Sequence, residues 1–283
     1  MSVWILYDQK QYDKNTWFAD HLVSCAEAYG EARLILTERL SYGTEDGRYV
    51  IRYDGKACTL PSIAIMRSID PFLSRYLERA GVRVCNPSVI SELCNDKRAT
   101  YLLLQGKVPV MRTRFADGIF FDPATVDAGE YPLVVKSAAG HGGSEVFLAK
   151  DPAELLSCVQ TIGKRPFVLQ ELAEPAGRDL RVYVLGGRIL AAALRTSESF
   201  KSNLSLGGKA EAYALSAAEE KMVQCVIGTF PTVPDFVGVD LLLTERGPVF
   251  NEVEDVVGTR MLYSCTDIDA ADRYVRWCIR SLV

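Results

Sequence analysis

The 283-residue sequence lacks the patterns of several common classes of protein. Its longest stretch without a charged residue is the 13 residues between Lys221 and Asp235, short of the roughly 20 that a membrane-spanning helix needs. Residues 1–10 show no signal-peptide pattern. Lysine and arginine total 32 against 36 aspartates and glutamates, so the net charge of −4 offers no basic excess for nucleic acid or an anionic membrane. We therefore expect a cytoplasmic protein that binds neither.

Cysteine and histidine are present without the spacing that metal or disulfide sites require. The eight cysteines include no C-x-x-C pair, so neither a zinc site nor a disulfide framework is predicted. Most lie in apolar surroundings and are interpreted as buried free thiols. Of only two histidines, His141 lies in a glycine-rich segment without a nearby carboxylate or cysteine, which favours a loop residue beside a ligand over a catalytic one. Neither G-x-S-x-G nor a Cys/His signature is found.

The composition is that of an ordinary globular protein, with 48% hydrophobic and 24% charged residues. Over residues 1–85, short apolar runs typical of strands alternate with stretches typical of helices. Residues 63–66 are predicted as a buried strand and residues 72–79 as the following helix, while Asp54-Gly55 is a strong hairpin signal. This alternation predicts a small open α/β domain.

The later part of the chain mixes helices with further strands. Asp96 is placed to cap a helix over residues 97–104. Ser216 and Glu219 form a capping box for a helix over residues 216–229. A terminal helix is predicted over residues 268–282, and strands over residues 110–115, 131–136, 146–149, 167–172, 180–185 and 189–195.

Residues 238–256 are interpreted as a hairpin of two buried strands. We expect its turn at Arg246, Gly247 and Pro248, between two apolar runs. Pairing of the strands would bring the acidic residue of the first run close to those of the second. The simpler alternative is a solvated hairpin end with scattered acids.

The acidic residues of this hairpin are candidate metal ligands. Because strand side chains alternate between faces, Glu252 and Glu254 share one face and Asp255 takes the other. Asp240 comes from the partner strand. Converging carboxylates repel one another unless a cation lies among them, and oxygen ligands suit Mg²⁺ or Mn²⁺, above all where phosphates complete the coordination.

The segment VVKSAAGHGGS, at residues 134–144, is a candidate phosphate site. It predicts a strand that delivers Lys136 to a loop of small residues, where backbone amides approach a phosphate and the lysine adds a charge. It is not a Walker loop, and Glu145 follows Ser144 where the dinucleotide-binding pattern needs a glycine. The alternative is a plain hairpin tip.

Two further segments carry charges that suit anionic ligands. One is a strand on which charged and apolar residues alternate, so that Asp179 and Arg181 share a face. The other is a polar loop with Arg195, Lys201 and Asn203. The simpler alternative for the first segment is a strand with one solvent-exposed face, and for the second a surface loop without function.

Taken in order, these segments resemble the ATP-grasp superfamily, and most closely its RimK-like branch of carboxylate–amine ligases. The resemblance covers the chain from about Asn86 onward, and the earlier residues match only in general character. It is carried by NPSV, NDK, PLVVK with the glycine loop, VLQEL, GRDLRVYVLGGRILAA, FKSNLSLGG, GVDLL and GPVFNEVED. It implies an α/β (α+β) protein with the ATP-grasp fold, in which an N-terminal open α/β domain (1–90) precedes central (91–165) and C-terminal (166–283) subdomains.

The resemblance also implies roles for individual residues. ATP would be held by Lys97 and Lys136 at its phosphates, by the loop with Gly140, Gly142, Gly143 and Ser144, by Glu171 and Leu172 at adenine and by Asp179 near the ribose. The reacting phosphate and the substrate carboxylate would be surrounded by Arg181, Arg195, Lys201 and Asn203. The Mg²⁺ (or Mn²⁺) ligands would be Asp240 and Glu252, with Glu254 as the third candidate.

Two residues depart from the family pattern. Glu254 stands where the family has asparagine, which adds a charge and a methylene and bears on the metal preference. Glu145 replaces a glycine that the family often has, which predicts a changed loop conformation. Arg67, in the segment MRSID, is a candidate substrate contact, although a surface arginine is the simpler interpretation.

The implied reaction is ATP-dependent formation of an amide or peptide bond on an amino acid or small peptide. A carboxylate attacks the γ-phosphate to give an acyl phosphate, and an amine then displaces phosphate. The alternatives are a small-molecule kinase of the same fold and a nucleotide-binding regulatory module without turnover. The sequence leaves the substrates and the oligomeric state open, including a homo-oligomer.

Overall fold

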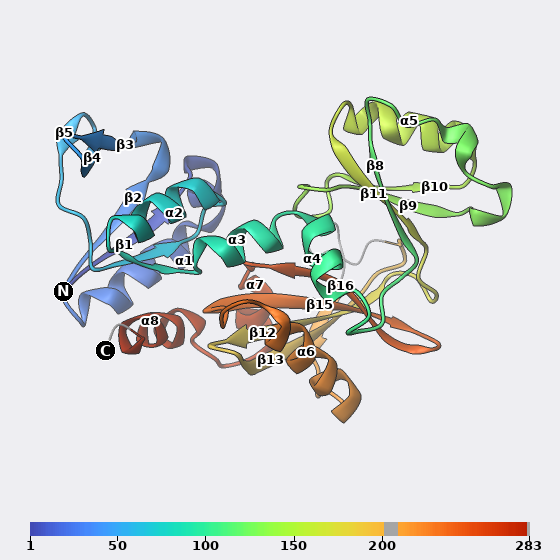
Figure 1. The fold of residues 1–283 in the computed structure, drawn as a ribbon. Coiled ribbons are helices and arrows are strands. Elements are labelled where there is room, and N and C mark those ends of the chain that lie inside the picture. The colour runs from blue at the N-terminus through green and yellow to red at the C-terminus, as the bar shows by residue number, and fades with distance from the viewer. Residues whose placement is uncertain (201–208, 282–283) are drawn as a thin grey trace.

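The described part of the chain is an α/β protein with four sheets (Figure 1). The structure is a computed structural model that describes residues 1–200 and 209–281. Figure 1 shows the N-terminal sheet at one end of the molecule, the sheet covered by helix α5 (Pro152–Ile162) at the other, and the C-terminal sheet between them. The mixed α/β fold class is confirmed. No helix among the described residues combines the length and apolar character of a membrane span.

A parallel sheet with the strand order β2-β1-β6-β7 forms where strands and helices alternate in the sequence. Helix α2 begins where Asp70 accepts a hydrogen bond from the Leu73 amide and Pro71 occupies the first turn. The hairpin predicted at Asp54-Gly55 is present, but its second strand covers only two residues. The elements are β1 (Ser2–Tyr7), α1 (Gln9–Glu27), β2 (Glu31–Leu36), η1 (Thr37–Arg39), β3 (Leu40–Glu45), β4 (Arg48–Tyr53), β5 (Lys56–Ala57), β6 (Ile63–Met66), α2 (Pro71–Arg79) and β7 (Arg83–Cys85).

The central sheet is antiparallel, with the order β10-β9-β11-β8. Two helices precede it, and the second starts as predicted, with Asp96 accepting a hydrogen bond from the Arg98 amide. Asp151 caps α5 in the same way, through the Glu154 amide. The elements are α3 (Ser88–Cys94), α4 (Lys97–Leu104), β8 (Thr113–Asp117), η2 (Pro123–Thr125), η3 (Ala128–Glu130), β9 (Leu133–Ser137), β10 (Val146–Ala149), α5 and β11 (Pro166–Glu171).

The C-terminal sheet is antiparallel, with the order β14-β13-β12-β15-β16. The capping box predicted at Ser216 and Glu219 opens α6. The terminal helix is shorter than predicted, because Asp269 caps it and fixes its start at Ala270. The elements are β12 (Arg178–Leu185), β13 (Arg188–Thr196), β14 (Lys209–Ala212), α6 (Ala217–Thr229), β15 (Phe236–Thr244), β16 (Gly247–Glu254), α7 (Arg260–Cys265) and α8 (Ala270–Arg280).

The predicted boundaries of strand β8 and of the β15–β16 hairpin were also wrong. Strand β8 starts at Thr113, not at residue 110, because Val110 forms a bridge with Phe250 of the C-terminal sheet before the chain reaches the central one. The β15–β16 hairpin turns at residues 245–246, one residue earlier than predicted, so that Gly247 and Pro248 belong to β16. Proline is tolerated there because β16 is an edge strand, where the missing N–H leaves no ladder bond unmade.

The hydrophobic cores join segments from different parts of the chain. Helices α3 and α4 contribute Ile90 and Leu104 to the core under the C-terminal sheet, although their residues precede the central sheet in sequence. Helix α8 contributes Tyr274 to a core that also contains Ile5 and Leu22 of the N-terminal region. Burial of these apolar side chains therefore holds the first and last parts of the chain together.

Asn86 links the N-terminal and C-terminal sheets through its side chain, which is 3% exposed. Its Nδ2 donates to the carbonyl oxygens of Phe236 and Asp255, each at 2.9 Å. Its Oδ1 accepts from the amides of Asp235 and Phe236, at 2.7 and 2.9 Å. All four hydrogen-bonding positions of the amide are used, so removal of the side chain leaves four buried backbone groups without this partner.

We predict that Asn86→Ala lowers the free energy of unfolding by about 3 kcal/mol, because each of the four hydrogen bonds contributes about 1 kcal/mol and relaxation recovers part of the loss. Urea unfolding measures the change. The exposed Gln160 of α5 provides a matched control, and Gln160→Ala should change the free energy by less than about 0.5 kcal/mol. Equal stability of the two variants would contradict the role given to Asn86.

Candidate active site

The predicted hairpin brings its carboxylates together in the C-terminal sheet. Asp240 of β15 pairs with Glu252 of β16 on one side and with Arg181 of β12 on the other. Oxygen atoms of Asp240, Glu252 and Glu254 all lie within 4.8 Å of one another. Asp255 points elsewhere, because its carboxylate accepts a hydrogen bond from Asn95 Nδ2 at 2.9 Å. The expected separation of the acidic residues into two faces is thus observed.

Acids and bases alternate along a buried chain of ion pairs across this sheet. Arg195 donates to Asp179 through Nε at 2.8 Å and to Asp240 through Nη2 at 2.6 Å. Arg181 donates to Asp240 through Nε at 2.8 Å and Nη2 at 2.7 Å, and the same Nη2 lies 2.7 Å from Glu254 Oε1. Asp240 is fully buried and is the shared partner of both arginines. It therefore fixes the position of both guanidinium groups.

The environment of the carboxylates shifts their pKa values in different directions. Burial opposes the charge of Asp240, but Arg181 and Arg195 outweigh it and lower the pKa of Asp240 to about 2. Burial also opposes the charge of Glu252, and Lys97 outweighs it, so the pKa of Glu252 is lowered. For Glu254 burial prevails over the attraction of Arg181, and the pKa is raised. Asp240 and Glu252 therefore hold their charge more firmly than Glu254.

Two lysines approach this cluster from the other side. Lys97, in the first turn of α4, donates to the Gly140 carbonyl at 2.5 Å and lies 3.5 Å from Glu252. Lys136 of β9 donates to Gln170 Oε1 at 2.8 Å and to Asn251 Oδ1 at 2.9 Å. The glycine loop and the acidic hairpin, which are far apart in sequence, are thus joined through these lysines.

A cavity lies between the central and C-terminal sheets and contains most of the predicted nucleotide-binding residues. Its lining combines charged groups with the apolar side chains of Val134, Leu172 and Leu242. Of the predicted residues, those that line it are Lys97, Lys136, Gly140, Gly142, Gly143, Glu171, Leu172, Asp179, Arg195 and Glu252. Asp179 reaches the wall while its carboxylate is paired with Arg195.

A second cavity, of about 550 Å³, adjoins the first and extends to the N-terminal sheet. Lys97, Gly142, Arg195 and Glu252 line both cavities, so the two meet at the lysine–carboxylate contact. The second cavity also takes in Arg181, Glu254, His141 and Ser144. Ser144 was predicted to bind the nucleotide, but it lines this second cavity and not the first.

The structure leaves two predicted site residues undescribed and changes the interpretation of others. Lys201 and Asn203 lie outside the described residues. Of the two interpretations given for Arg67, the simpler one of a surface arginine is wrong, because the residue is only 5% exposed and lines the second cavity. Gln170 and Asn251, the partners of Lys136, had no predicted role, although both lie within motifs that carry the resemblance, VLQEL and GPVFNEVED.

The donor set fits a divalent cation bound together with phosphate groups. Carboxylate oxygens are the ligands that hard cations prefer. The acids and bases already balance, since the four acids Asp179, Asp240, Glu252 and Glu254 face the four bases Lys97, Lys136, Arg181 and Arg195. Without an excess negative charge, the cluster attracts an isolated cation weakly. The negative charge of a nucleotide's phosphates would supply the attraction for the cation that the cluster alone lacks.

A family model described as the RimK-like ATP-grasp domain matches residues 94–278. This chain belongs to the RimK-like ATP-grasp family. It is accordingly an ATP-dependent carboxylate–amine ligase, which forms a carbon–nitrogen bond. The family and the enzyme class predicted from the sequence are both confirmed.

Similarity to named proteins extends over most of the chain. β-Citrylglutamate synthase B from Mus musculus is 29% identical over 268 residues, which cover 87% of this chain and 68% of the relative. N-acetylaspartylglutamate synthase A from Homo sapiens is 30% identical over 243 residues, covering 79% and 61%. A probable α-L-glutamate ligase from Haemophilus ducreyi is 28% identical over 202 residues, covering 69% and 66%.

Solved structures share the fold over nearly the full chain. A RimK domain protein from Sphaerobacter thermophilus superposes with a TM-score of 0.74 at 21% identity, covering 99% of this chain and 100% of that one. D-alanine–D-alanine ligase from Bacillus anthracis, in complex with ATP, gives 0.75 at 14% identity, covering 100% and 97%. Both support the ATP-grasp fold of this ligase.

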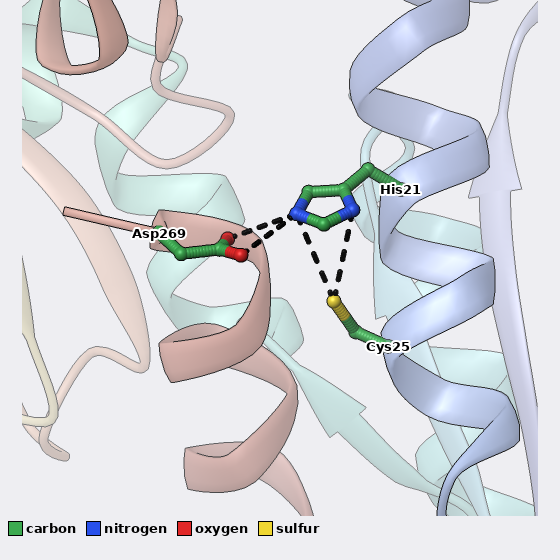
Figure 2. Close-up of side chains that lie close together, drawn as sticks. All are labelled: His21, Cys25 and Asp269. Carbon is green, nitrogen blue, oxygen red and sulfur yellow. Dashed lines mark hydrogen bonds and ion pairs between the residues drawn. The ribbon is translucent and has the colours of Figure 1, made fainter. Parts of the chain in front are cut away.

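A separate cluster of polar side chains joins α1 to α8 of the RimK-like ligase (Figure 2). His21 Nε2 lies 3.0 and 2.9 Å from the two carboxylate oxygens of Asp269, and Cys25 Sγ is 3.9 Å from both ring nitrogens of His21. Burial, and then Asp269 and Asp272, raise the pKa of Cys25 to about 11. The thiol is therefore protonated at neutral pH, and we interpret the cluster as a contact between the two helices.

The lysine of the glycine loop predicts a pH dependence of nucleotide binding. Burial lowers the pKa of Lys136 to about 8; Glu252 opposes this shift and Lys97 adds to it. The side chain is thus charged below that pH and neutral above it. If phosphate binding requires the charge, the affinity for MgADP should fall about tenfold between pH 7 and 9, as expected for one proton at this pKa.

Calorimetric titration of MgADP at a series of pH values measures this effect. Lys136→Met should bind MgADP more weakly, with little change in affinity over the same range. The exposed Lys164 provides the matched control, and Lys164→Met should keep the pH dependence of the native protein. A Lys136→Met protein that still loses affinity as the pH rises would show that another group titrates.

Proposed function

We propose that this ligase activates the carboxylate of an amino acid or small peptide as an acyl phosphate and transfers the acyl group to an amine. The observation that carries the proposal is the meeting of two cavities at Lys97 and Glu252. One cavity has apolar walls and lysines that suit a nucleotide. The other, of about 550 Å³, has Arg67, Arg181 and Glu254 in its lining and suits the substrates. Their junction is where a γ-phosphate and a carboxylate would react.

The nucleotide is proposed to lie in the first cavity, with Glu171 and Leu172 at the base and Asp179 near the ribose. Lys97 and Lys136 would neutralise the phosphates, supported by the backbone of the loop at residues 140–144. Three apolar side chains in the lining (Val134, Leu172 and Leu242), and the contacts of the two lysines with Gly140 and Asn251, support this assignment.

Asp240, Glu252 and Glu254 are proposed to hold the divalent ion, Mg²⁺ or Mn²⁺. The ion would supply charge neutralisation for the phosphoryl group. Arg181 already lies 2.7 Å from both Asp240 Oδ2 and Glu254 Oε1. Glu254, which replaces the family's asparagine, therefore also pairs with Arg181. We expect substitution of Glu254 to lower the activity less than substitution of Glu252.

The reaction needs positioning and charge neutralisation more than a side-chain nucleophile. A substrate carboxylate oxygen attacks the γ-phosphorus. The bond between this phosphorus and the bridging oxygen to the β-phosphate breaks, and ADP leaves with that oxygen. Arg181 and Arg195, fixed by Asp240, would stabilise the charge on the transferring group. The amine then attacks the acyl carbon, phosphate leaves, and a proton is released.

The names of the relatives suggest the kind of substrate. The synthases similar to this chain are named for citrylglutamate and N-acetylaspartylglutamate, and a third relative is named as a probable glutamate ligase. We propose that an acidic amino acid such as L-glutamate is one of the two substrates here. The eight cysteines, all free thiols, are compatible with the proposed cytoplasmic location.

Substitutions in the acidic hairpin separate the proposed roles of its residues. Glu252→Gln should lower the turnover rate about a hundredfold or more, because it removes a ligand charge at the reacting phosphate. Glu254→Asn, which restores the family's residue, should retain turnover and shift the preference between Mg²⁺ and Mn²⁺. The rate of phosphate release, measured with Mg²⁺ and with Mn²⁺, gives both the turnover and the metal preference. The exposed Glu211→Gln is the control. Unfolding of Glu254→Asn, seen by circular dichroism, would instead make Glu254 structural.

Phosphate release from ATP, measured across a panel of acids and amines, tests the proposed function. We expect release to require one acid and one amine together, with an amide as the product by mass spectrometry. A stable phosphorylated alcohol would indicate a kinase. Phosphate release that is independent of both substrates and unchanged in Asp240→Asn would contradict the proposal.

A further inference from the structure

Arg67 lies at the end of the second cavity that is formed by the N-terminal sheet. It directly follows β6, and its amide donates to the Leu6 carbonyl of β1 at 2.8 Å. Ligands of open parallel sheets bind beyond the carboxyl ends of the strands, which is where this arginine lies. Because Arg67 is 5% exposed, its charge is held inside the protein and not on its surface.

The guanidinium of Arg67 uses only part of its hydrogen-bonding capacity. Nη2 donates to the Val257 carbonyl at 2.8 Å, and the group lies over the Phe18 ring at 5.4 Å. Nε and Nη1 are buried and have no hydrogen-bond partner in residues 1–200 and 209–281. A buried cation with unused donors is costly unless an anion pairs with it.

A second unpartnered donor lies beside Arg67. Leu6 of β1 pairs with Met66 of β6, so Tyr7 and Arg67 are the next pair along these neighbouring strands and share a face of the sheet. The Tyr7 hydroxyl is buried and likewise has no partner within the described part of the chain. Both residues line the 550 Å³ cavity.

The other buried cations of this cavity already have anionic partners. Arg181 and Arg195 are paired with Asp240, and Lys97 lies 3.5 Å from Glu252. Asp255 also lines the cavity, but its carboxylate is directed to Asn95. Arg67 therefore differs from these cations in having no carboxylate within ion-pair distance among the described residues.

We infer that Arg67, assisted by the Tyr7 hydroxyl, binds a second carboxylate of the substrate, distinct from the one that is activated. The planar guanidinium matches a planar carboxylate through two parallel hydrogen bonds. The substrate in this cavity is then an acidic molecule with a carboxylate at each end, one beside Arg67 and the other beside Lys97 and Glu252. This inference rests on the proposed function, because it assumes that the second cavity holds the carboxylate substrate.

Calorimetric binding of matched acids and amides tests the inference. The probes are L-glutamate against L-glutamine and L-aspartate against L-asparagine, each titrated into the native protein with MgADP present. We expect at least one acid to bind at least tenfold more tightly than its amide. Arg67→Met should reduce this preference to less than twofold, and Arg67→Lys, which keeps the charge without the planar fork, should lie between the two.

Controls separate local from general effects. The exposed Arg79→Met, in the same N-terminal region, should keep the native preference. MgADP should bind equally to Arg67→Met and to the native protein. Tyr7→Phe, which removes only the hydroxyl, should weaken acid binding about threefold, and it provides a second test should Arg67→Met fail to fold.

Three results would overturn the inference while leaving MgADP binding, and with it the proposed nucleotide site, intact. These are no binding of either acid, equal binding of each acid and its amide, and an unchanged preference in Arg67→Met and Tyr7→Phe. Failure of the native protein to bind MgADP would instead overturn the proposed function, and the inference with it.

Discussion

The fully buried carboxylate of Asp240 is the constraint on which the rest of the site depends. A charged group removed from water in this way persists only where its partners satisfy it. Arg181 and Arg195 do so, and each reaches it from a strand of the same sheet. The antiparallel register of β12, β13 and β15 therefore determines where two guanidinium groups and the carboxylate proposed to bind the metal ion lie.

The balance of charge in this cluster links its structure to its chemistry. Acids and bases compensate one another in the sheet, and their ion pairs hold the arginines in a buried, low-dielectric environment. In the proposed reaction, charge that develops during phosphoryl transfer would meet groups that need no reorganisation. Glu254 fits this view, because its carboxylate is a second partner of the Arg181 Nη2 atom that also contacts Asp240.

Local patterns predicted the parts of the site that depend on neighbours in sequence. The hairpin of β15 and β16, the glycine loop after Lys136 and the caps at Asp96 and Ser216 follow from alternation, turn residues and capping rules. The resemblance to a family then ordered these segments into one site, because the same sequence of motifs recurs in that fold.

Features that depend on packing between distant segments could not be predicted from the sequence. The burial of Arg67 arises because Phe18 of α1 and the Val257 carbonyl near the C-terminal hairpin enclose it. Strand β8 starts late because Val110 first bridges Phe250. Likewise, the pairing of Lys136 with Asn251 requires the central and C-terminal sheets to meet. Such contacts carry no periodicity or spacing in the sequence.

The central claim is that a carboxylate becomes an acyl phosphate in the cavity junction at Lys97 and Glu252. Transfer of ¹⁸O from a labelled acid substrate tests it most directly. During turnover with ATP and an amine, one ¹⁸O atom should appear in the released phosphate and one should remain in the amide product. Unlabelled phosphate, with amide still formed, would contradict an acyl phosphate and with it this account of the site.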